Sequence, residues 1–314
     1  MPKTELQSDQ EILRTGCGLL DRSDRGKLAL TGPEAKSFLH GQVTNDVEGL
    51  SPGEGCYAAF LNPKGKMQGD LRILDTGDEL WLDTEREALQ PLFTMIHRYK
   101  LGSDLELHKR TLQQGLLSLI GPQAREIAGA EDLAPTEHAN AQAEIDGIPV
   151  LLVATDAGVD LVTDAERTQE LADALRARGA RDVAEGAAEA LRVQRGRPRF
   201  GREMDESTIP QEAGINERAV SFTKGCYVGQ ETVARLHYRG KPNRHLRGLR
   251  LSGPAETGAE LRLGDKVVGR VGTVAGERAL AIVRREAEPG ATLTVGEGEA
   301  RAEVVELPFK DAPR

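Results

Sequence analysis

Residues 221–240 read S-F-T-K-G-C-Y-V-G-Q-E-T-V-A-R-L-H-Y-R-G and contain Cys226, one of three cysteines in the chain. Cysteine is often a small buried apolar residue, so packing is one interpretation of this position. The other is a reactive or ligating thiolate, because Lys224 lies two residues earlier and flanking glycines let the backbone approach a ligand. A helix that begins near Tyr227 would place the sulfur at its positive end. The residues alone leave both interpretations open.

A run of cations continues from this segment. Between residues 232 and 255 no acidic residue occurs, and the run contains Arg235, His237, Arg239, Lys241, Arg244, His245, Arg247 and Arg250. A solvated edge is the ordinary meaning of such a run. In a chain of net charge −9 it also suits an anionic ligand tail or RNA phosphates. A transient tRNA contact through residues 235–250 is therefore one expectation.

The composition limits the class of protein. The 314 residues are 39% apolar and 29% charged, as in ordinary soluble proteins with two or three domains. The net charge excludes a protein whose whole surface binds phosphate backbones. Three scattered cysteines without a C-x-x-C pair predict no disulfide framework, no zinc site and no resident [4Fe–4S] cluster. No apolar run reaches membrane-spanning length and no secretory leader is evident, so we expect a cytoplasmic protein without membrane contact.

The first part of the chain predicts a mixed unit. Residues 27–30 read as a strand, and Pro33 suits the first turn of a helix that runs to about His40. Two apolar stretches flank the turn N-P-K-G and predict a hairpin. A third strand at 79–83 leads into a helix over about 84–99, in which Pro91 predicts a kink or break.

Two short echoes indicate an internal duplication. T-G-P-E-A at 31–35 is matched by I-G-P-Q-A at 120–124, each after an apolar strand. E-L-W-L-D-T-E-R at 79–86 is loosely matched by D-L-V-T-D-A-E-R at 160–167. Together with a helix over roughly 183–195, these echoes predict an α+β fold with two related halves and antiparallel sheets.

The character of the sequence changes at about Pro242. Glycine recurs there, and short alternating apolar stretches predict five or six strands in a small antiparallel barrel or sandwich. Upstream, the loop N-P-K-G-K-M-Q-G-D at 62–70 ends in Asp70. This aspartate is interpreted either as a carboxylate of the site or as a simple turn residue.

Several motifs in order resemble one known family. K-G-C-Y-V-G-Q-E at 224–231 is similar to the K-G-C-[F/Y]-x-G-Q-E signature of the YgfZ proteins, which are relatives of the glycine cleavage T-protein (GcvT, an aminomethyltransferase). F-L-H-G-Q-V-T-N-D-V at 38–47, F-L-N-P-K-G-K-M at 60–67 and I-P-Q-E-A-G at 209–214 resemble the same branch. The resemblance extends over roughly residues 20–250.

The resemblance implies a GcvT-like three-lobed fold. It comprises duplicated α+β halves with antiparallel sheets around a central channel, followed by a small C-terminal β-barrel. We expect the first lobe at residues 1–112, the second lobe with the cysteine motif at 113–242, and the barrel at 243–314. The implied cofactor is tetrahydrofolate or a derivative, bound in the channel of a monomer. The implied role is the assembly, insertion or maintenance of iron–sulfur clusters in client proteins, including tRNA-modifying enzymes.

The resemblance also indicates which residues form the site. Cys226, activated by Lys224 and facing the channel, and Asp70 are the expected catalytic groups. The expected folate contacts are Tyr57, Asn62, Gln194, Glu212, Tyr227, Gln230, Glu231 and Arg235. The cation run is expected to meet the glutamate tail of the folate.

Two departures from the T-protein pattern weaken the transferase alternative. The T-protein has an adjacent Asp-Asp where this chain has Gly69 and Asp70, so only half of that pair is present. Its L-R-x-E-x-G segment, whose Glu contacts the pterin, reads L-R-V-Q-R-G here, with Gln194 at the acidic position. An amide offers one acceptor and one donor in place of the two acceptors of a carboxylate. Folate-dependent aminomethyl or methyl transfer remains the alternative to a non-catalytic helper of cluster enzymes.

Overall fold

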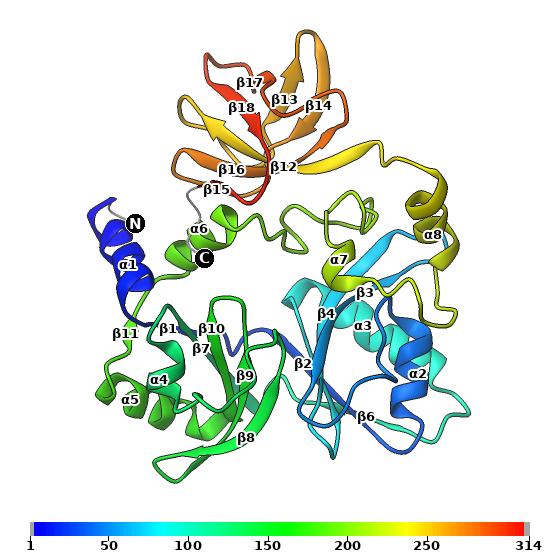
Figure 1. Ribbon diagram of the computed structural model, residues 1–314, viewed down its shortest axis with the longest axis vertical. Coiled ribbons are helices and arrows are strands. Elements are labelled where there is room, and N and C mark those ends of the chain that lie inside the picture. Colours follow the sequence, from blue (N-terminus) through cyan, green and yellow to red (C-terminus); the bar gives the residue numbers. More distant parts are fainter. Residues whose placement is uncertain (1–2, 311–314) are drawn as a thin grey trace.

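The protein has three sheets, each in its own lobe, arranged around a central gap (Figure 1). The structure, a computed structural model, describes residues 3–310. Two lobes lie side by side, and a third lobe from the C-terminal part closes the ring above them. The ends of the expected first and last domains, residues 1–2 and 311–314, lie outside the described residues. The expected α+β fold of three lobes is confirmed.

The first lobe is built on a five-stranded antiparallel sheet in the order β3-β4-β5-β2-β6. Its strands are β2 (Gly26–Thr31), β3 (Gly55–Leu61), β4 (Met67–Asp75), β5 (Leu80–Thr84) and β6 (Glu106–Lys109). The helices α2 (Ala35–Gln42) and α3 (Arg86–Tyr99) bury apolar side chains such as Leu39 and Leu92 in its core. The hairpin, strands and helices expected in this region are all present. Pro91 lies inside α3 without ending it.

The second lobe contains a six-stranded sheet in the order β11-β1-β7-β10-β9-β8. Its strands are β1 (Gly18–Asp21), β7 (Gln114–Ile120), β8 (Asn140–Ile145), β9 (Ile148–Ala154), β10 (Gly158–Asp164) and β11 (Arg181–Asp182). Its helical segments are α4 (Ala124–Ala128), η1 (Ala165–Arg167) and α5 (Thr168–Ala177). All neighbours are antiparallel except β1 and β11, which run parallel.

The two sequence echoes correspond to equivalent turns in the two lobes. β2 and β7 are each followed by a glycine with positive φ, 104° at Gly32 and 125° at Gly121. A side chain would be strained at either position, which explains why glycine occurs at both. The second echo also holds, because β5 and β10 each lead directly into a helical segment.

The chain crosses between lobes more often than the expected boundaries imply. β1, from the range 1–112, pairs in the second sheet, and α1 (Lys3–Thr15) packs against α6 (Glu185–Gln194). The segment from Phe200 to Val233, expected in the second lobe, packs in the core of the first. It includes α7 (Asn216–Ala219) and the start of α8 (Gln230–Arg239). The cysteine motif therefore belongs spatially to the first lobe.

The C-terminal lobe is a closed six-stranded barrel with one extra short edge strand. Its strands are β12 (Arg244–Leu251), β13 (Glu260–Leu263), β14 (Lys266–Arg270), β15 (Val274–Ala275), β16 (Arg278–Arg284), β17 (Thr292–Val295) and β18 (Arg301–Val305). Pairing between β12 and β16 closes the ring, which removes exposed edges from these strands. The expected barrel is confirmed. Among the described residues, no helix is long and apolar enough to cross a membrane.

Candidate functional site

A cavity of about 510 Å³ lies between the two α+β lobes. Both sheets, α6 and the segment that follows α6 contribute to its wall. The wall is strongly charged: nine arginines and ten acidic residues line it. Because the two signs nearly balance, the cavity is polar without a large net charge.

Asp70, which is buried, and Tyr57, which is half-buried, form a pair on the wall of the first lobe. They face each other from the neighbouring strands β3 and β4, and the Tyr57 hydroxyl donates a hydrogen bond of 2.5 Å to Asp70 Oδ2. Thr84 Oγ1 donates to the backbone carbonyl of Asp70 at 2.5 Å. Burial raises the pKa of Asp70 to about 6, although the Tyr57 hydrogen bond opposes the shift. This carboxyl group therefore titrates close to neutral pH.

The position before Asp70 has no room for a second carboxylate. A Cβ atom added to Gly69 would lie 2.5 Å from the Phe60 ring and 2.7 Å from the Cβ of Ala88. Such distances are far inside van der Waals contact. The packing of β3 and α3 thus explains why a single aspartate occurs where the T-protein pattern has two.

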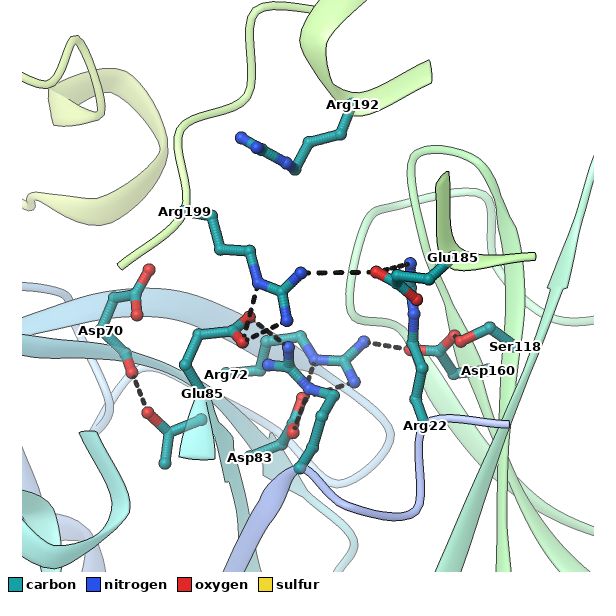
Figure 2. A network of polar contacts seen from close by, with 12 residues as sticks. Arg22, Asp70, Arg72, Asp83, Glu85, Ser118, Asp160, Glu185, Arg192 and Arg199 are labelled. Atoms are coloured by element: carbon teal, nitrogen blue, oxygen red, sulfur yellow. Dashed lines mark hydrogen bonds and ion pairs between the residues drawn. The ribbon is translucent and has the colours of Figure 1, made fainter. Parts of the chain in front are cut away.

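A chain of buried ion pairs connects the lobes beside this pair (Figure 2). Arg72 donates to Asp83 Oδ2 of the first lobe and to Asp160 Oδ2 of the second, both at 2.6 Å. Arg25 binds the other oxygen of Asp83 at 2.7 Å and also pairs with Glu85. Burial alone would raise the pKa of Asp83, but Arg25 and Arg72 outweigh it and hold that pKa below its usual range.

Arg199 extends this chain to α6. Figure 2 shows its guanidinium between Glu85 and Glu185. It donates to Glu85 at 2.9 Å, to Glu185 at 3.3 Å and to Glu189 at 3.2 Å. Its single side chain therefore ties the first lobe to α6, which borders the second.

Arg192 connects α6 to the C-terminal barrel. Its guanidinium donates to Glu203 Oε2 at 2.9 Å and to Thr273 Oγ1 at 2.6 Å. The Thr273 amide in turn donates to Glu203 Oε1 at 2.8 Å. All three lobes are thus joined through one set of polar contacts around the cavity.

A second cluster joins the lobes on another part of the wall. The Arg218 guanidinium lies 4.9 Å from the centre of the Tyr57 ring and pairs with Glu137 of the second lobe. Asn45 Nδ2 donates to the carbonyls of Tyr57 and Arg218 at 2.9 and 3.0 Å. Next to Glu137 is His138, whose pKa burial lowers to about 4 despite the opposing carboxylate.

Lys224 of the cysteine motif stabilises a helix end. Its Nζ donates to the carbonyls of His40, Val43 at 2.8 Å and Asn45 at 3.0 Å, at the C-terminal end of α2. A cation is favoured there because the last carbonyls of a helix carry partial negative charge. Burial lowers the pKa of Lys224 to about 8 against the attraction of Asp46. These contacts give the ammonium a structural role, and the expectation that it also activates Cys226 stays a prediction.

Cys226 is exposed, and the residues that line the cavity do not include it. The expectation that it faces the channel is therefore not met. Helix α8 begins at Gln230, later than expected from the sequence. The reason is Gly229, whose φ of 83° is incompatible with a helix and whose Cβ position would lie 2.6 Å from the Asn62 carbonyl oxygen. Cys226 therefore does not occupy the positive end of a helix.

The remaining motif residues lie around the loop that contains Cys226 and do not line the cavity. Asn62 Oδ1 accepts hydrogen bonds from the amides of Lys64 and Lys66 at 2.9 and 3.1 Å and shapes the β3–β4 turn. Tyr227 is buried in the first core, and Lys224 Nζ lies 5.0 Å from its ring centre. The other expected contacts are on α8: Gln230, Glu231 and Arg235. The residues lining the cavity include none of these.

Two further expected folate contacts also lie elsewhere. Gln194, at the end of α6, lines a separate cavity of about 300 Å³ between α6 and α1. Glu212 is buried and accepts hydrogen bonds from Arg244 at 2.7 and 3.1 Å. Of the eight expected folate contacts, Tyr57 alone lines the large cavity, together with Asp70 from the expected catalytic set.

The cation run divides into two groups. Arg244 and Arg247 are engaged, with Glu212 and with Glu306 at 3.4 Å, and hold the barrel strand β12 to its surroundings. Arg235, Arg239 and Lys241 lie on or just after α8 and have no side-chain partner within residues 3–310. Aromatic rings accompany them: His237 is exposed and stacks at 3.7 Å on Phe222, which is partly buried against the first core, and Tyr238 is 66% exposed. The run does not border the cavity.

The arginines that line the cavity were not among the residues predicted from the sequence. Four of them belong to R-G-R-P-R-F-G-R at 195–202, in which every second or third residue is arginine. That density was a usable signal, although ion pairing with distant carboxylates was not visible in it. His138 gave no signal, because a lone histidine outside a motif has no distinctive spacing. Within residues 3–310 no group of three His, Cys, Asp or Glu is placed to hold a metal ion.

Two family models together match almost the whole chain. The model described as the GCVT N-terminal domain matches residues 3–224. The model described as the C-terminal beta-barrel domain of CAF17 matches residues 244–307, which form the closed barrel.

Curated relatives are similar over most of their own length. A tRNA-modifying protein YgfZ of Yersinia pseudotuberculosis is 32% identical, over 73% of this chain and 69% of the relative. An aminomethyltransferase of Rubrobacter xylanophilus is 28% identical over 97% and 86%, and a putative chloroplastic transferase of Arabidopsis thaliana 29% over 94% and 71%. The crystal structure of aminomethyltransferase T of the Bartonella henselae glycine cleavage system matches with a TM-score of 0.86 at 21% identity, over 98% of this chain and 90% of that chain. At this identity the structural likeness shows the fold.

Proposed function

This chain belongs to the GcvT superfamily and carries a CAF17-type C-terminal barrel, and from this membership we propose that it is a folate-binding protein. The resemblance to the YgfZ branch read from the motif at 224–231 is confirmed by the relative at 32% identity. The proposed ligand is tetrahydrofolate or a derivative, held in the cavity between the two α+β lobes. The observation that carries the proposal is the pair of buried Asp70 and half-buried Tyr57 on the wall of that cavity.

The cavity fits such a ligand in size and chemistry. Its volume of about 510 Å³ is within the range of small-molecule sites, and it offers both carboxylates and guanidinium groups. Asp70 would accept hydrogen bonds from N–H groups of the pterin, with Tyr57 holding the carboxylate in place. Arg202, exposed at the cavity and without a side-chain partner within residues 3–310, would suit the carboxylates of the glutamate tail. Tetrahydrofolate supplies a nucleophilic ring nitrogen that carries one-carbon units.

The second part of the proposal is a role in the assembly or maintenance of iron–sulfur clusters in client enzymes. Cys226 supports it, since its thiol is exposed and its loop is fixed by Lys224 at the end of α2. An exposed thiol on a rigid loop is accessible to a sulfur atom, an iron centre or a client protein. All three cysteines are free thiols, as expected for the reducing cytoplasm in which we place the protein.

Folate-dependent transfer of an aminomethyl or methyl group is a second candidate activity. The observation in its favour is the pKa of Asp70, which burial raises to about 6 and thereby places in the working range of a general base. The packing at Gly69 weighs against it, because the second acid of the T-protein pattern has no space. Turnover of an aminomethyl donor with tetrahydrofolate, lost in Asp70→Asn, would establish this activity.

Contact with tRNA or an anionic client surface is proposed for α8. Arg235, Arg239 and Lys241 are free of side-chain partners within the described residues, and exposed Tyr238 adds a stacking surface. Cations interleaved with aromatic rings are typical of surfaces that bind single-stranded nucleic acid.

Anaerobic titration calorimetry with tetrahydrofolate tests the folate proposal. Asp70→Asn should weaken binding about tenfold or more, because the amide replaces a carboxylate acceptor at the ligand. Gln194→Ala is the matched control: it removes the residue that the T-protein pattern assigned to the pterin but that lines the other cavity. Equal affinity of wild type and Asp70→Asn, or loss in Gln194→Ala alone, would refute this location.

Complementation of cells that lack the endogenous factor tests the role of Cys226. Cys226→Ala should fold normally, because the side chain is exposed, yet fail to restore the activity of cluster-dependent enzymes. Cys17→Ala is the control, since Cys17 is buried at 2% exposure and should affect stability alone. Full rescue by Cys226→Ala would remove the chemical role of this sulfur.

A further inference from the structure

Arg218 links the Asp70–Tyr57 pair to the second lobe. It belongs to α7, in the segment that packs in the core of the first lobe, and it lines the large cavity. Its guanidinium lies over the Tyr57 ring, 4.9 Å from the ring centre. Through Nε and Nη2 it also binds both carboxylate oxygens of Glu137, which precedes β8 in the second lobe. One guanidinium therefore contacts both lobes.

The backbones of Arg218 and Tyr57 are fixed to each other. Asn45 Nδ2 donates to the Tyr57 carbonyl at 2.9 Å and to the Arg218 carbonyl at 3.0 Å. The Arg218 side chain is 29% exposed, so its direction depends on what the guanidinium binds. Its ion-pair partner among the described residues is Glu137. The carboxylate of the second lobe therefore holds the guanidinium over the tyrosine ring of the first.

The guanidinium strengthens the hydrogen bond that the Tyr57 hydroxyl donates to Asp70. Attraction between the cation and the ring face restricts the ring. Burial and Asp70 raise the pKa of the Tyr57 hydroxyl well above its usual range, and Arg218 opposes that rise. A hydroxyl that holds its proton less tightly is a better donor, so the charge polarises the 2.5 Å bond to Asp70 Oδ2.

We propose that Arg218 is a positioning residue that keeps the Tyr57 hydroxyl on Asp70. Glu137 holds Arg218 in place from the second lobe, so the acceptor of the first lobe is complete only while the two lobes are in contact. The inference rests on the proposed function insofar as Asp70 binds the folate. The effect of Arg218 on Asp70 itself concerns the protein without ligand and is measured there.

The expected effect on Asp70 has a definite sign. Burial raises the pKa of Asp70 to about 6, and the Tyr57 hydrogen bond opposes this rise. Glu85 raises this pKa as well and Arg25 lowers it, and the variants leave both in place. Arg218→Met keeps an apolar side chain over the ring but removes the cation. The weaker Tyr57 bond should then raise the pKa of Asp70 by about one further unit.

Carbon-13 NMR of the Asp70 carboxyl carbon against pH measures this pKa in the full chain, with Asp70→Asn to assign the signal. Tyr57→Phe and Arg218→Met should each raise the pKa. In the Tyr57→Phe background, Arg218→Met should add less than about 0.2 units, because Arg218 acts through the hydroxyl. Thermal denaturation establishes that each variant folds. A second variant, Arg218→Met with Glu137→Gln, leaves no unpaired carboxylate and should show the same rise.

Two single variants separate positioning from a simple change of charge. Glu137→Gln removes a negative charge, which by itself would lower the pKa of Asp70, whereas loss of positioning raises it. Arg178→Gln is the matched control, because it removes an arginine that pairs with Asp146 at 2.7 Å and does not line the cavity. It should leave the Asp70 titration unchanged.

Affinity for tetrahydrofolate between pH 5 and pH 8, measured anaerobically, connects this role to the ligand. The midpoint of its pH dependence should rise in Arg218→Met by the same amount as the pKa of Asp70. An unchanged Asp70 titration in Arg218→Met, an equal rise in the Tyr57→Phe background, or a loss of affinity that is the same at every pH would overturn the assignment. If the titration shifts as expected but wild type binds no folate, the proposed function fails and the positioning role stands.

Discussion

Asp70 is a buried carboxyl group whose protonation is linked to folding. Burial raises its pKa from 3.8 to about 6, so the folded protein binds this proton more tightly than the unfolded chain. Its contribution to stability is fully present below about pH 4 and is lost as the pH rises through about 6. Asp70→Asn removes this pH dependence. The free energy of unfolding of the variant, relative to that of wild type, should therefore rise by about 2–3 kcal/mol as the pH increases from 4 to 7.

Urea unfolding of both proteins at pH 4 and pH 7 measures this difference. Asp146→Asn is the control, because Asp146 is exposed on a turn. Parallel pH profiles for wild type and Asp70→Asn would show that the carboxyl group is not desolvated as described. If Asp70→Asn is more stable than wild type at pH 7 but binds folate more weakly, Asp70 serves ligand binding at a cost in stability.

Lys224 holds the cysteine loop by hydrogen bonds to three carbonyls at the end of α2. Lys224→Met keeps the aliphatic stem but leaves those carbonyls without their donor, and should cost about 2–4 kcal/mol. Hydrogen exchange should become faster in residues 221–229. The control is Lys64→Met at the exposed β3–β4 turn, for which a change within about 0.5 kcal/mol is expected. A similarly small effect at Lys224 would contradict its structural role.

The motif at 224–231 revealed the family but not the direction of its side chains. Lys224 precedes Cys226 by two residues, and proximity in sequence suggested an activating ammonium. In the structure its Nζ is committed to carbonyls near His40, which are about 180 residues away in the chain and invisible to local spacing. Gln194 was misplaced for a similar reason, because the orientation of α6 against α1 decides which cavity it borders.

At the scale of secondary structure, α8 combines free cations with exposed aromatic rings. If the helix binds tRNA, changing Arg235 and Arg239 together to Gln should weaken binding and lower the slope of log affinity against log salt by about 2. Arg244→Gln should leave that slope nearly unchanged, because Arg244 is paired with Glu212. Fluorescence anisotropy with a labelled tRNA between 50 and 200 mM salt is the measurement. Salt-independent or absent binding would exclude RNA as the partner of α8.

Most elements could be predicted because their signals are local. The echo of T-G-P-E-A and I-G-P-Q-A marked two strand-to-helix turns, each of which needs a glycine with positive φ. The start of α8 was placed too early, since the periodic pattern gave no hint that Gly229 must pack against the Asn62 carbonyl. Elements follow local rules, whereas their exact ends here depend on contacts between distant segments.

At the scale of the whole molecule, Arg199 joins the lobes through Glu85, Glu185 and Glu189. Arg199→Met would leave these carboxylates partly unpaired and should cost about 3–5 kcal/mol. Because the lobes are tied through this side chain, calorimetry should show broader unfolding or two separate transitions. Arg202→Met, in the same segment but without a side-chain partner among the described residues, should change stability by less than about 0.5 kcal/mol. One unaltered transition in Arg199→Met would contradict the coupling.

The sequence predicted three lobes but not how the chain is shared among them. β1 pairs in the second sheet, and the segment from Phe200 to Val233 returns to the core of the first lobe. Both crossings are long-range pairings between apolar surfaces of similar composition. No local sequence pattern shows which of these surfaces a segment packs against. The cavity is formed at these crossings. The ion pairs in its wall could therefore not be predicted from the sequence either.

If the proposed function is right, a reduced folate occupies the cavity between the two α+β lobes. A crystal structure of the protein grown anaerobically with tetrahydrofolate is the most direct test. We expect the pterin ring in this cavity, with a ring or amino nitrogen within about 3 Å of an Asp70 carboxylate oxygen. Density for the folate beside Gln194, in the smaller space between α1 and α6, or on the surface near Cys226 would contradict it.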